Sequence, residues 1–423
     1  ATTAGALELH SSGTITQLEG TLSAASLSGD AGDVSILLNG NAIATLGTFT
    51  VTGGDFRLAD GIALDVTGAV SAVNVALTDT AAGTPALTVS GSVAGTGTVG
   101  FTTTGTQRFT GTVDAGSGTL DLNAAGVTQE GGTLIAGVLL SSVGVTGDVR
   151  LDSGSNAVAT LGGFTVTGGT LALTDGVALA VTGPAAGTDV VLSGTTLNIT
   201  GAVNASGTAS LTATAGTLDI AATGMVSGIG VVLNGAAGIT ETGVLKADTL
   251  SGGSTAGGAS LTGAAMTGNH IGTLGDFATT LDFTLDDNTA LTVAGTVTAP
   301  NVTLSSAAGG TALTVSGAVT ATGTASLTAT AGAMNIAATG TVSGSDAVVL
   351  QAVQLLSGSG VVVAGLLSGG SSGGAVSLTG ANLIASLGSF SAAGDVTVAN
   401  GQALTVTGPV SGTLVTLKTS GSL

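Results

Sequence analysis

One stretch of this chain occurs twice at a fixed spacing, and this recurrence limits the fold more than any other feature. The sequence GTASLTATAGTLDIAATGMVSG at residues 207–228 returns as GTASLTATAGAMNIAATGTVSG at residues 323–344, with 18 of 22 positions identical. The offset is 323 − 207 = 116 residues. A segment that repeats in this way is one structural unit stacked on copies of itself. We therefore predict a repeat architecture.

A second marker extends the long repeat over the whole chain. The pattern Asn-x-(Ile/Val)-(Ala/Gly)-(Thr/Ser)-Leu-Gly-x-Phe occurs at residues 41–49, 156–164, 269–277 and 382–390. Its Leu lies at positions 46, 161, 274 and 387, at nearly equal intervals. We expect long repeats of 112–117 residues, and both ends of the chain fall within one. Residues 1–423 are thus expected to form one continuous solenoid, cut as a window from a longer protein.

A shorter repeat lies inside the long one. The pattern Ala-Leu-x-Val-(Thr/Ser/Ala)-Gly places Leu, Val and Gly at alternate positions, which indicates a strand with one buried face that ends in a turn. The spacing is 23 residues from Leu64 to Leu87, 22 from Leu291 to Leu313, and 18 from Leu179 to Leu197. Two or three such strands in each repeat predict a parallel β-helix of about 20 coils of 18–23 residues.

Composition supports a narrow solenoid. Gly accounts for 74 residues, aromatics for 2% and charged residues for 7%, against roughly 25% charged residues in a typical soluble domain. The core must therefore be thin and aliphatic, filled in part by Phe49, Phe164, Phe277 and Phe390. A hydrophobic content of 43% argues against disorder. No run of about 18 apolar residues occurs, so we expect a chain that does not span a membrane.

The chain is strongly acidic. Its 24 acidic and five basic residues give a net charge of −19, which repels phosphate backbones and argues against nucleic acid as a partner. The absence of Cys is compatible with an extracellular protein that lacks disulfides. The chain begins at Ala1 without Met or a signal peptide, so we expect targeting segments to have been removed or to lie outside it.

Repeat style links the chain to a known group of proteins. Ile15-Thr16-Gln17 precedes Gly20-Thr21-Leu22, and Val127-Thr128-Gln129 precedes Gly132-Thr133-Leu134 in the same way. With its short alternating strands and its short coils, the chain resembles secreted bacterial β-helical adhesins of the filamentous-haemagglutinin and autotransporter-passenger type. The resemblance implies a right-handed parallel β-helix at the cell surface that acts as a stalk, adhesin or matrix component. The Asn-Pro-rich secretion domain and the C-terminal barrel of these families are absent from the sequence.

The sequence offers little for catalysis. His10 and His270 are 260 positions apart, and His10 takes the place of Asn123 in the next copy, which favours a surface-facing polar position. No Ser-His-Asp or metal-ligand spacing is present. The densest group of acids is Asp282, Asp286 and Asp287. We predict no catalytic, cofactor-binding or metal-binding residue and no enzyme activity.

Turn residues account for many of the acids. A turn signal recurs at Asp60-Gly61, Asp175-Gly176, Asp287-Asn288 and Asn400-Gly401. We interpret the scattered Asp residues, including those of these signals, as solvated turn residues. Calcium stays possible as a cofactor, but the Gly-Gly-x-Gly-x-Asp motif is missing. Thr-x-Thr at residues 212–214 and 328–330 suggests an ice-binding face. The unequal coil lengths argue against such a face, because they should break an ordered array of Thr side chains.

We therefore predict a structural extracellular protein: a cell-surface fibre, stalk or biofilm-matrix filament that acts as an adhesin by self-association or surface attachment. Its expected partners are copies of itself, or a surface or glycan. Two alternatives stay open. One is a glycan-binding or glycan-cleaving β-helix, and the other is a calcium-stabilised or ice-binding adhesin segment.

Overall fold

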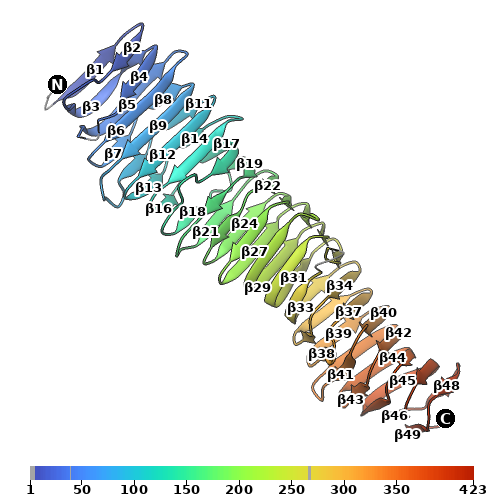
Figure 1. The fold of residues 1–423 in the computed structure, drawn as a ribbon. Coiled ribbons are helices and arrows are strands. Elements are labelled where there is room, and N and C mark those ends of the chain that lie inside the picture. The colour runs from blue at the N-terminus through green and yellow to red at the C-terminus, as the bar shows by residue number, and fades with distance from the viewer. Residues whose placement is uncertain (1–4, 39, 265–267) are drawn as a thin grey trace. The chain divides into compact units, whose positions relative to one another are not determined.

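The computed structural model describes residues 5–38, 40–264 and 268–423, and these residues form 49 strands and no helix. Strands of successive coils pair in parallel, so the prediction of a β-solenoid of about 20 coils is confirmed. Figure 1 shows the strands as stacked arrows. The chain divides into two compact units, residues 1–210 (unit 1) and 211–423 (unit 2).

The strands of unit 1 are short, because Gly or another turn residue follows most of them. They are β1 (Ala6–His10), β2 (Thr14–Thr16), β3 (Ser23–Ala31), β4 (Asp33–Ile36), β5 (Ala42–Val51), β6 (Asp55–Asp60), β7 (Leu64–Val66), β8 (Ala69–Ala72), β9 (Asn74–Asp79), β10 (Leu87–Val89), β11 (Ser92–Gly95), β12 (Thr98–Thr103), β13 (Thr106–Phe109), β14 (Thr112–Asp114), β15 (Thr119–Asn123), β16 (Gly126–Gln129), β17 (Thr133–Leu140), β18 (Val149–Leu151), β19 (Ala157–Leu161), β20 (Phe164–Thr165), β21 (Leu171–Thr174), β22 (Leu179–Val181), β23 (Ala185–Gly187), β24 (Val190–Gly194), β25 (Leu197–Ile199) and β26 (Ala202–Ala205).

Strand β27 (Thr208–Ala213) includes the boundary between the units, and the remaining strands belong to unit 2. They are β28 (Thr217–Ile220), β29 (Met225–Gly235), β30 (Gly238–Glu241), β31 (Val244–Ser254), β32 (Ala259–Leu261), β33 (His270–Thr279), β34 (Phe283–Asp287), β35 (Leu291–Val293), β36 (Thr296–Ala299), β37 (Val302–Ser306), β38 (Thr311–Val315), β39 (Ala318–Ala321), β40 (Thr324–Ala329), β41 (Ala333–Ile336), β42 (Thr341–Ala352), β43 (Leu356–Gly358), β44 (Val361–Ser371), β45 (Val376–Ala392), β46 (Val396–Asn400), β47 (Thr405–Val406), β48 (Val410–Ser411) and β49 (Val415–Thr419).

A coil of unit 1 consists of three strands with turns between them. Strands β7, β8 and β9 form one coil, and β10, β11 and β12 lie on them in the same order. Because side chains alternate across a strand, every second residue points inward and meets its counterpart in the next coil. One inward column consists of Ile15, Val34, Phe56, Val75, Val99, Leu120, Leu139 and Leu161.

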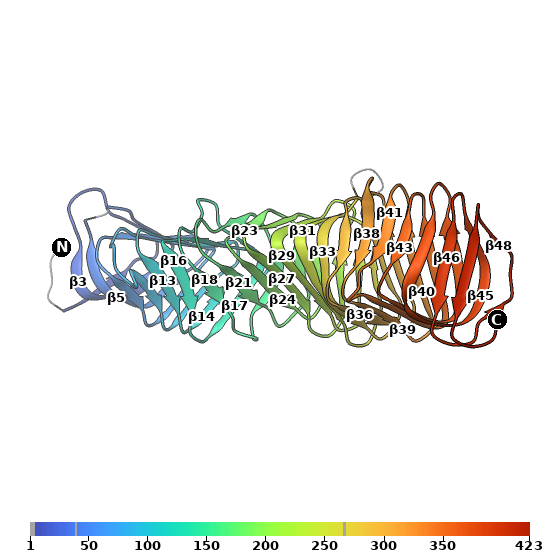
Figure 2. The ribbon, with the colours of Figure 1, turned by 90° about the horizontal axis from the view of Figure 1, so that it is seen from below.

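Unit 2 has the same construction. Figure 2 shows β36 and β39 side by side, and these strands pair in parallel. An inward column of this unit consists of Leu291, Leu313, Met334, Leu356, Val376 and Val396. The pairing of like residues keeps the apolar face inward in every coil, since a slip of one residue would turn that face outward.

The core is thin and aliphatic, as predicted. All eight Phe side chains are fully buried, including the four of the nine-residue marker. Two of those four pack on a Phe in the following strand, with ring centroids 5.0 Å apart for Phe49–Phe56 and 4.6 Å apart for Phe277–Phe283. The Phe residues thus fill the core locally, as the prediction of core filling required.

Coil length varies, and the turns absorb the difference. The three Leu pairs that defined the predicted coil lengths are register partners: Leu64 with Leu87, Leu179 with Leu197, and Leu291 with Leu313. Some coils are slightly longer than the predicted range allows, because Val75 pairs with Val99 and Ala259 pairs with Phe283. All four Pro residues lie between strands, where the missing N–H breaks no ladder.

The long repeat is not a whole number of coils. In unit 2 the column of the marker residue Leu274 continues through Val293, Val315, Ile336, Gly358 and Leu378, which is five coils. The next marker residue, Leu387, lies further along the chain and pairs with Leu367 in another column. Equivalent features of successive long repeats within this unit therefore face different directions.

Candidate functional site

A buried hydrogen-bond network surrounds the Asn that begins each nine-residue marker. Asn41 is 1% exposed. Its Oδ1 accepts hydrogen bonds from Gln17 Nε2 at 2.7 Å and from the backbone N–H of Leu22 at 2.9 Å. Its Nδ2 donates to Gln17 Oε1 at 2.9 Å and to the carbonyl of Ala59 at 3.0 Å. The side chain thus joins neighbouring coils and satisfies backbone groups that the turns leave free.

The Asn is constant, whereas its side-chain partner varies. The side-chain pairs are Gln17–Asn41, Gln129–Asn156 and Glu241–Asn269. In the last copy Gly358 takes the register position of Glu241. Asn382 keeps the bond to a carbonyl of the following coil, to Ala399 at 2.9 Å, that Asn41 makes to Ala59. Gln17 and Gln129 stand out in the sequence as the last residue of a recurring Ile/Val-Thr-Gln phrase, but the sequence alone indicates no partner for them.

The four predicted turn residues belong to the same network. Asp60, Asp175, Asp287 and Asn400 are only 0%, 4%, 2% and 6% exposed. The Oδ1 of each accepts the backbone N–H of the residue two positions after the marker Asn, at 2.8–3.0 Å, from Ile43, Val158, Ile271 and Ile384 respectively. The prediction that Asp60, Asp175 and Asp287 are solvated is wrong, because each side chain turns inward to a backbone donor of the preceding coil.

Burial shifts the titration of these acids. Desolvation raises the pKa of Asp60 and Asp175 to about 6, although backbone N–H donors act in the opposite direction. Asp79, the register partner of Asp60 in the next coil, also has a pKa raised by burial to about 6. Burial likewise raises the pKa of Glu241 and of Asp287. The chain therefore holds several carboxyl groups that titrate closer to neutrality than a solvated acid does.

The two His residues lie in different units. His10 has a side chain that is 59% exposed and hydrogen-bonds to Asp30, with Glu8 at 3.5 Å, and the bond to Asp30 raises the pKa of the imidazole. The surface-facing interpretation of His10 is thus confirmed, although Asn123, at the corresponding position of the next copy, is buried. His270 is exposed on β33, in register with Lys246.

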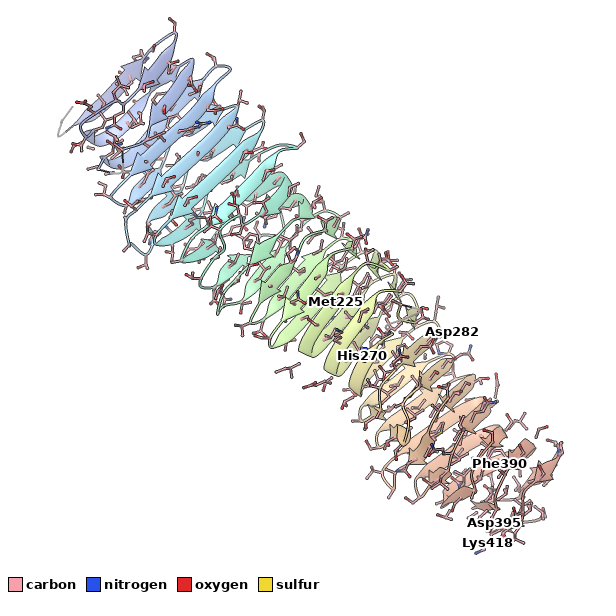
Figure 3. All side chains as sticks on the ribbon, in the orientation of Figure 1. Met225, His270, Asp282, Phe390, Asp395 and Lys418 are labelled. Carbon is pink, nitrogen blue, oxygen red and sulfur yellow. The ribbon has the colours of Figure 1, made fainter. Side chains whose placement is uncertain are left out.

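The structure does not bring the three predicted acids together. Asp282 is exposed and accepts a hydrogen bond from Asn301 Nδ2 at 2.9 Å. Asp286 and Asp287 are neighbours on β34, so their side chains point to opposite sides of the strand, and only Asp287 is fully buried. Figure 3 labels Asp282 and His270, which lie apart on unit 2. These acids therefore do not form a facing pair for acid–base chemistry.

Unit 2 contains two surface recesses at equivalent places of its long repeats. The first, of about 610 Å³, crosses β27, β29, β31 and β33, and the second, of about 260 Å³, crosses β40, β42, β44 and β45. Thr212 and Thr214 line the first recess, and Thr328 and Thr330 line the second. The Thr-x-Thr pairs that suggested an ice-binding face thus lie in these recesses.

Hydroxyl side chains, with one amide among them, also align along the outside of unit 2. One outward column consists of Thr249, Thr273, Thr292, Thr314, Asn335, Ser357, Ser377, Thr397 and Thr416. Coils of unequal length do not break this column, contrary to the argument that we set against an ice-binding face, because the turns take up the extra residues.

Across residues 5–38, 40–264 and 268–423, no group of three or more His, Asp or Glu side chains is arranged to hold a metal ion. The part of the chain that the structure describes also contains no helix that could span a bilayer.

Comparison with known proteins gave no relative: no family model, no curated protein and no solved structure matches this chain.

Proposed function

We propose that the chain is a structural extracellular protein that serves as a stalk, cell-surface fibre or matrix filament. The observation that carries this proposal is the unbroken column of like residues through each unit, such as Leu291, Leu313, Met334 and Leu356 in unit 2. Each coil pairs with the next through backbone hydrogen bonds along the stacking direction, and such a ladder resists extension. Inward side chains serve this stacking, and outward ones are mostly small and polar.

The outward side chains support a scaffold more than a catalyst. Carboxyl groups of raised pKa, such as Asp60 and Asp175, are held by backbone donors inside the solenoid, where no substrate reaches them. The only His that hydrogen-bonds to a carboxylate in the described residues is exposed His10, which has no nucleophile within its hydrogen bonds. We therefore propose that the protein is not an enzyme. Its relation to secreted β-helical adhesins, and with it a bacterial surface location, is part of the same proposal.

Electron microscopy of the purified full chain tests this proposal. We expect extended particles of constant width, either single or joined end to end as concentration rises. The variant Leu313→Asp, which places a charge in an inward column, should abolish these particles, because an unpaired buried carboxylate is strongly unfavourable.

The neighbouring substitution Thr314→Asp is the matched control, because Thr314 lies on the same strand but points outward. It should leave the particles unchanged. Compact particles from the unmodified chain at every concentration would contradict the scaffold proposal. Thermal melting with and without a chelator tests the alternative of a calcium-stabilised adhesin segment. That alternative requires the Tm to fall when calcium is removed.

A further inference from the structure

The two recesses of unit 2 share one construction. In each, a glycine lies on the outward side between two coils: Asn234–Gly253–Ala278 in the first and Gln351–Gly370–Ser391 in the second. A Cβ on Gly253 would clash with the carbonyl of Ala278, and a Cβ on Gly370 with the carbonyl of Ser391. The floor of each recess is thus bare backbone, flanked by an amide side chain on the preceding coil.

The first long repeat, in unit 1, fills the same position differently. There the register equivalents are His10, Asp30 and Thr50, and the hydrogen bond between His10 and Asp30 occupies the place of the recess. The glycine in unit 2 therefore opens a space that the first long repeat closes with charged side chains.

The first recess is neutral and rich in hydrogen-bonding groups. Its lining contains Thr212, Thr214, Asn234, Thr255 and Thr280 together with Ala and Gly residues, and it contains no charged side chain in a chain of net charge −19. Hydroxyl and amide groups both donate and accept hydrogen bonds. This lining matches a ligand that is uncharged and carries many hydroxyl groups.

A buried hydroxyl distinguishes the first recess from the second. Ser254 lines the first recess, is 4% exposed, and its Oγ has no hydrogen-bond partner among the described residues. The equivalent Ser371 donates to the carbonyl of Gln354 and accepts the N–H of Gly374 at 3.0 Å. The first recess is thus larger and keeps one polar group whose hydrogen-bonding capacity is unused.

We propose that the recess around Gly253 binds a neutral saccharide chain that lies along the stacking direction. The recess crosses four strands of successive coils, which at ~4.8 Å per coil is about 14 Å, enough for about three sugar rings. The absence of aromatic rings from its lining removes the stacking that strong sugar sites use, so the dissociation constant is expected to be about 1 mM.

Because the long repeat is not a whole number of coils, the second recess faces another direction. Strand β42 carries both columns, with Ser343 in the column of the first recess and Gln351 in that of the second. The two recesses therefore act as separate sites, and the smaller one is expected to bind more weakly.

Ligand-observed saturation-transfer NMR on the full chain tests the proposal with three neutral trisaccharides, cellotriose, maltotriose and N-acetylchitotriose, and with trigalacturonate as a charged comparator. We expect saturable binding of at least one neutral trisaccharide and none of trigalacturonate. The double variant Thr212→Val and Asn234→Leu should weaken binding at least fivefold while the circular-dichroism spectrum and Tm stay unchanged. Thr320→Val, which removes an outward hydroxyl from β39, should leave binding unchanged.

No saturable binding of any neutral trisaccharide overturns the proposal, as does equal binding by the double variant or preferential binding of trigalacturonate. This result is independent of the scaffold proposal, since the particles seen by electron microscopy do not depend on a saccharide. A negative result in the saccharide-binding experiment therefore does not affect the scaffold proposal, and a negative result in electron microscopy does not affect the saccharide proposal.

Discussion

Single polar residues inside the solenoid decide local stability, and two equivalent serines show how. Ser254 and Ser371 occupy the same position of successive long repeats and are 4% and 3% exposed. Of these two serines, only Ser371 has an Oγ that is hydrogen-bonded to another described residue. A buried polar group without a partner costs about 1–3 kcal/mol, whereas a satisfied one is modestly stabilising.

The substitutions Ser254→Ala and Ser371→Ala should therefore have opposite effects. We expect Ser254→Ala to raise the free energy of unfolding by about 1 kcal/mol and Ser371→Ala to lower it by about 1 kcal/mol. Chemical denaturation followed by circular dichroism measures both. Destabilisation of similar size in both variants would show that Oγ of Ser254 makes a bond equivalent to that of Ser371.

At the scale of the element, the buried network around each marker Asn shows which side chain the position prefers. Gln129 Nε2 donates to Asn156 Oδ1 at 2.8 Å. Glu241 holds the same place beside Asn269, but its Oε1 has no partner among the described residues, and burial raises its pKa. A carboxyl group here is less suitable than an amide of the same shape.

We expect Glu241→Gln to stabilise the chain at pH 7 by about 1–2 kcal/mol, because the amide keeps the bonded oxygen and supplies the missing donor. A folded-state pKa above the unfolded value means that the stability associated with Glu241 is fully present below the unfolded pKa and is lost as pH rises. The gain from the substitution should therefore shrink at pH 4. The reciprocal variant Gln129→Glu should be destabilising at pH 7, and a stable Gln129→Glu protein would rule out this account of the network.

At the scale of the whole molecule, the buried acids make stability depend on pH in an unusual direction. Asp60, Asp79 and Asp175 have pKa values of about 6 in the folded chain against 3.8 for the solvated group. The folded state thus binds more protons than the unfolded state between about pH 4 and pH 6, and stability falls as pH rises through that window. Self-repulsion of a chain of net charge −19 acts in the same direction.

We expect a higher Tm at pH 4 than at pH 7.5, with each of the three acids contributing about 1 kcal/mol after allowance for partial hydration. Asp175→Asn should reduce this pH dependence and raise the Tm at pH 7.5, because Asn400 already serves at the equivalent position. Asp282→Asn, at an exposed acid, is the control and should leave the slope unchanged. A Tm that rises between pH 4 and pH 7.5 would contradict the assignment of raised pKa values.

The sequence by itself determined the coil. Gly at the end of each alternating Leu–Val run sets where strands stop, and the spacing from Leu64 to Leu87 or from Leu291 to Leu313 is the register between coils, because only matching apolar residues can share an inward column. The burial of the marker Phe residues could be predicted as well, because a large apolar side chain in a thin solenoid can avoid water only in the core.

The tertiary structure alone decided which way the polar residues turn and which way each long repeat faces. Asp60 and Asp175 follow a turn pattern in the sequence, but a backbone N–H of the preceding coil draws them inside, and that donor is distant along the chain. The direction of each recess depends on how residues divide between strands and turns, so one long repeat becomes five coils and part of a sixth. The spacing of residues along the chain does not show how they divide between strands and turns, because turns of different length join strands that pair equally well.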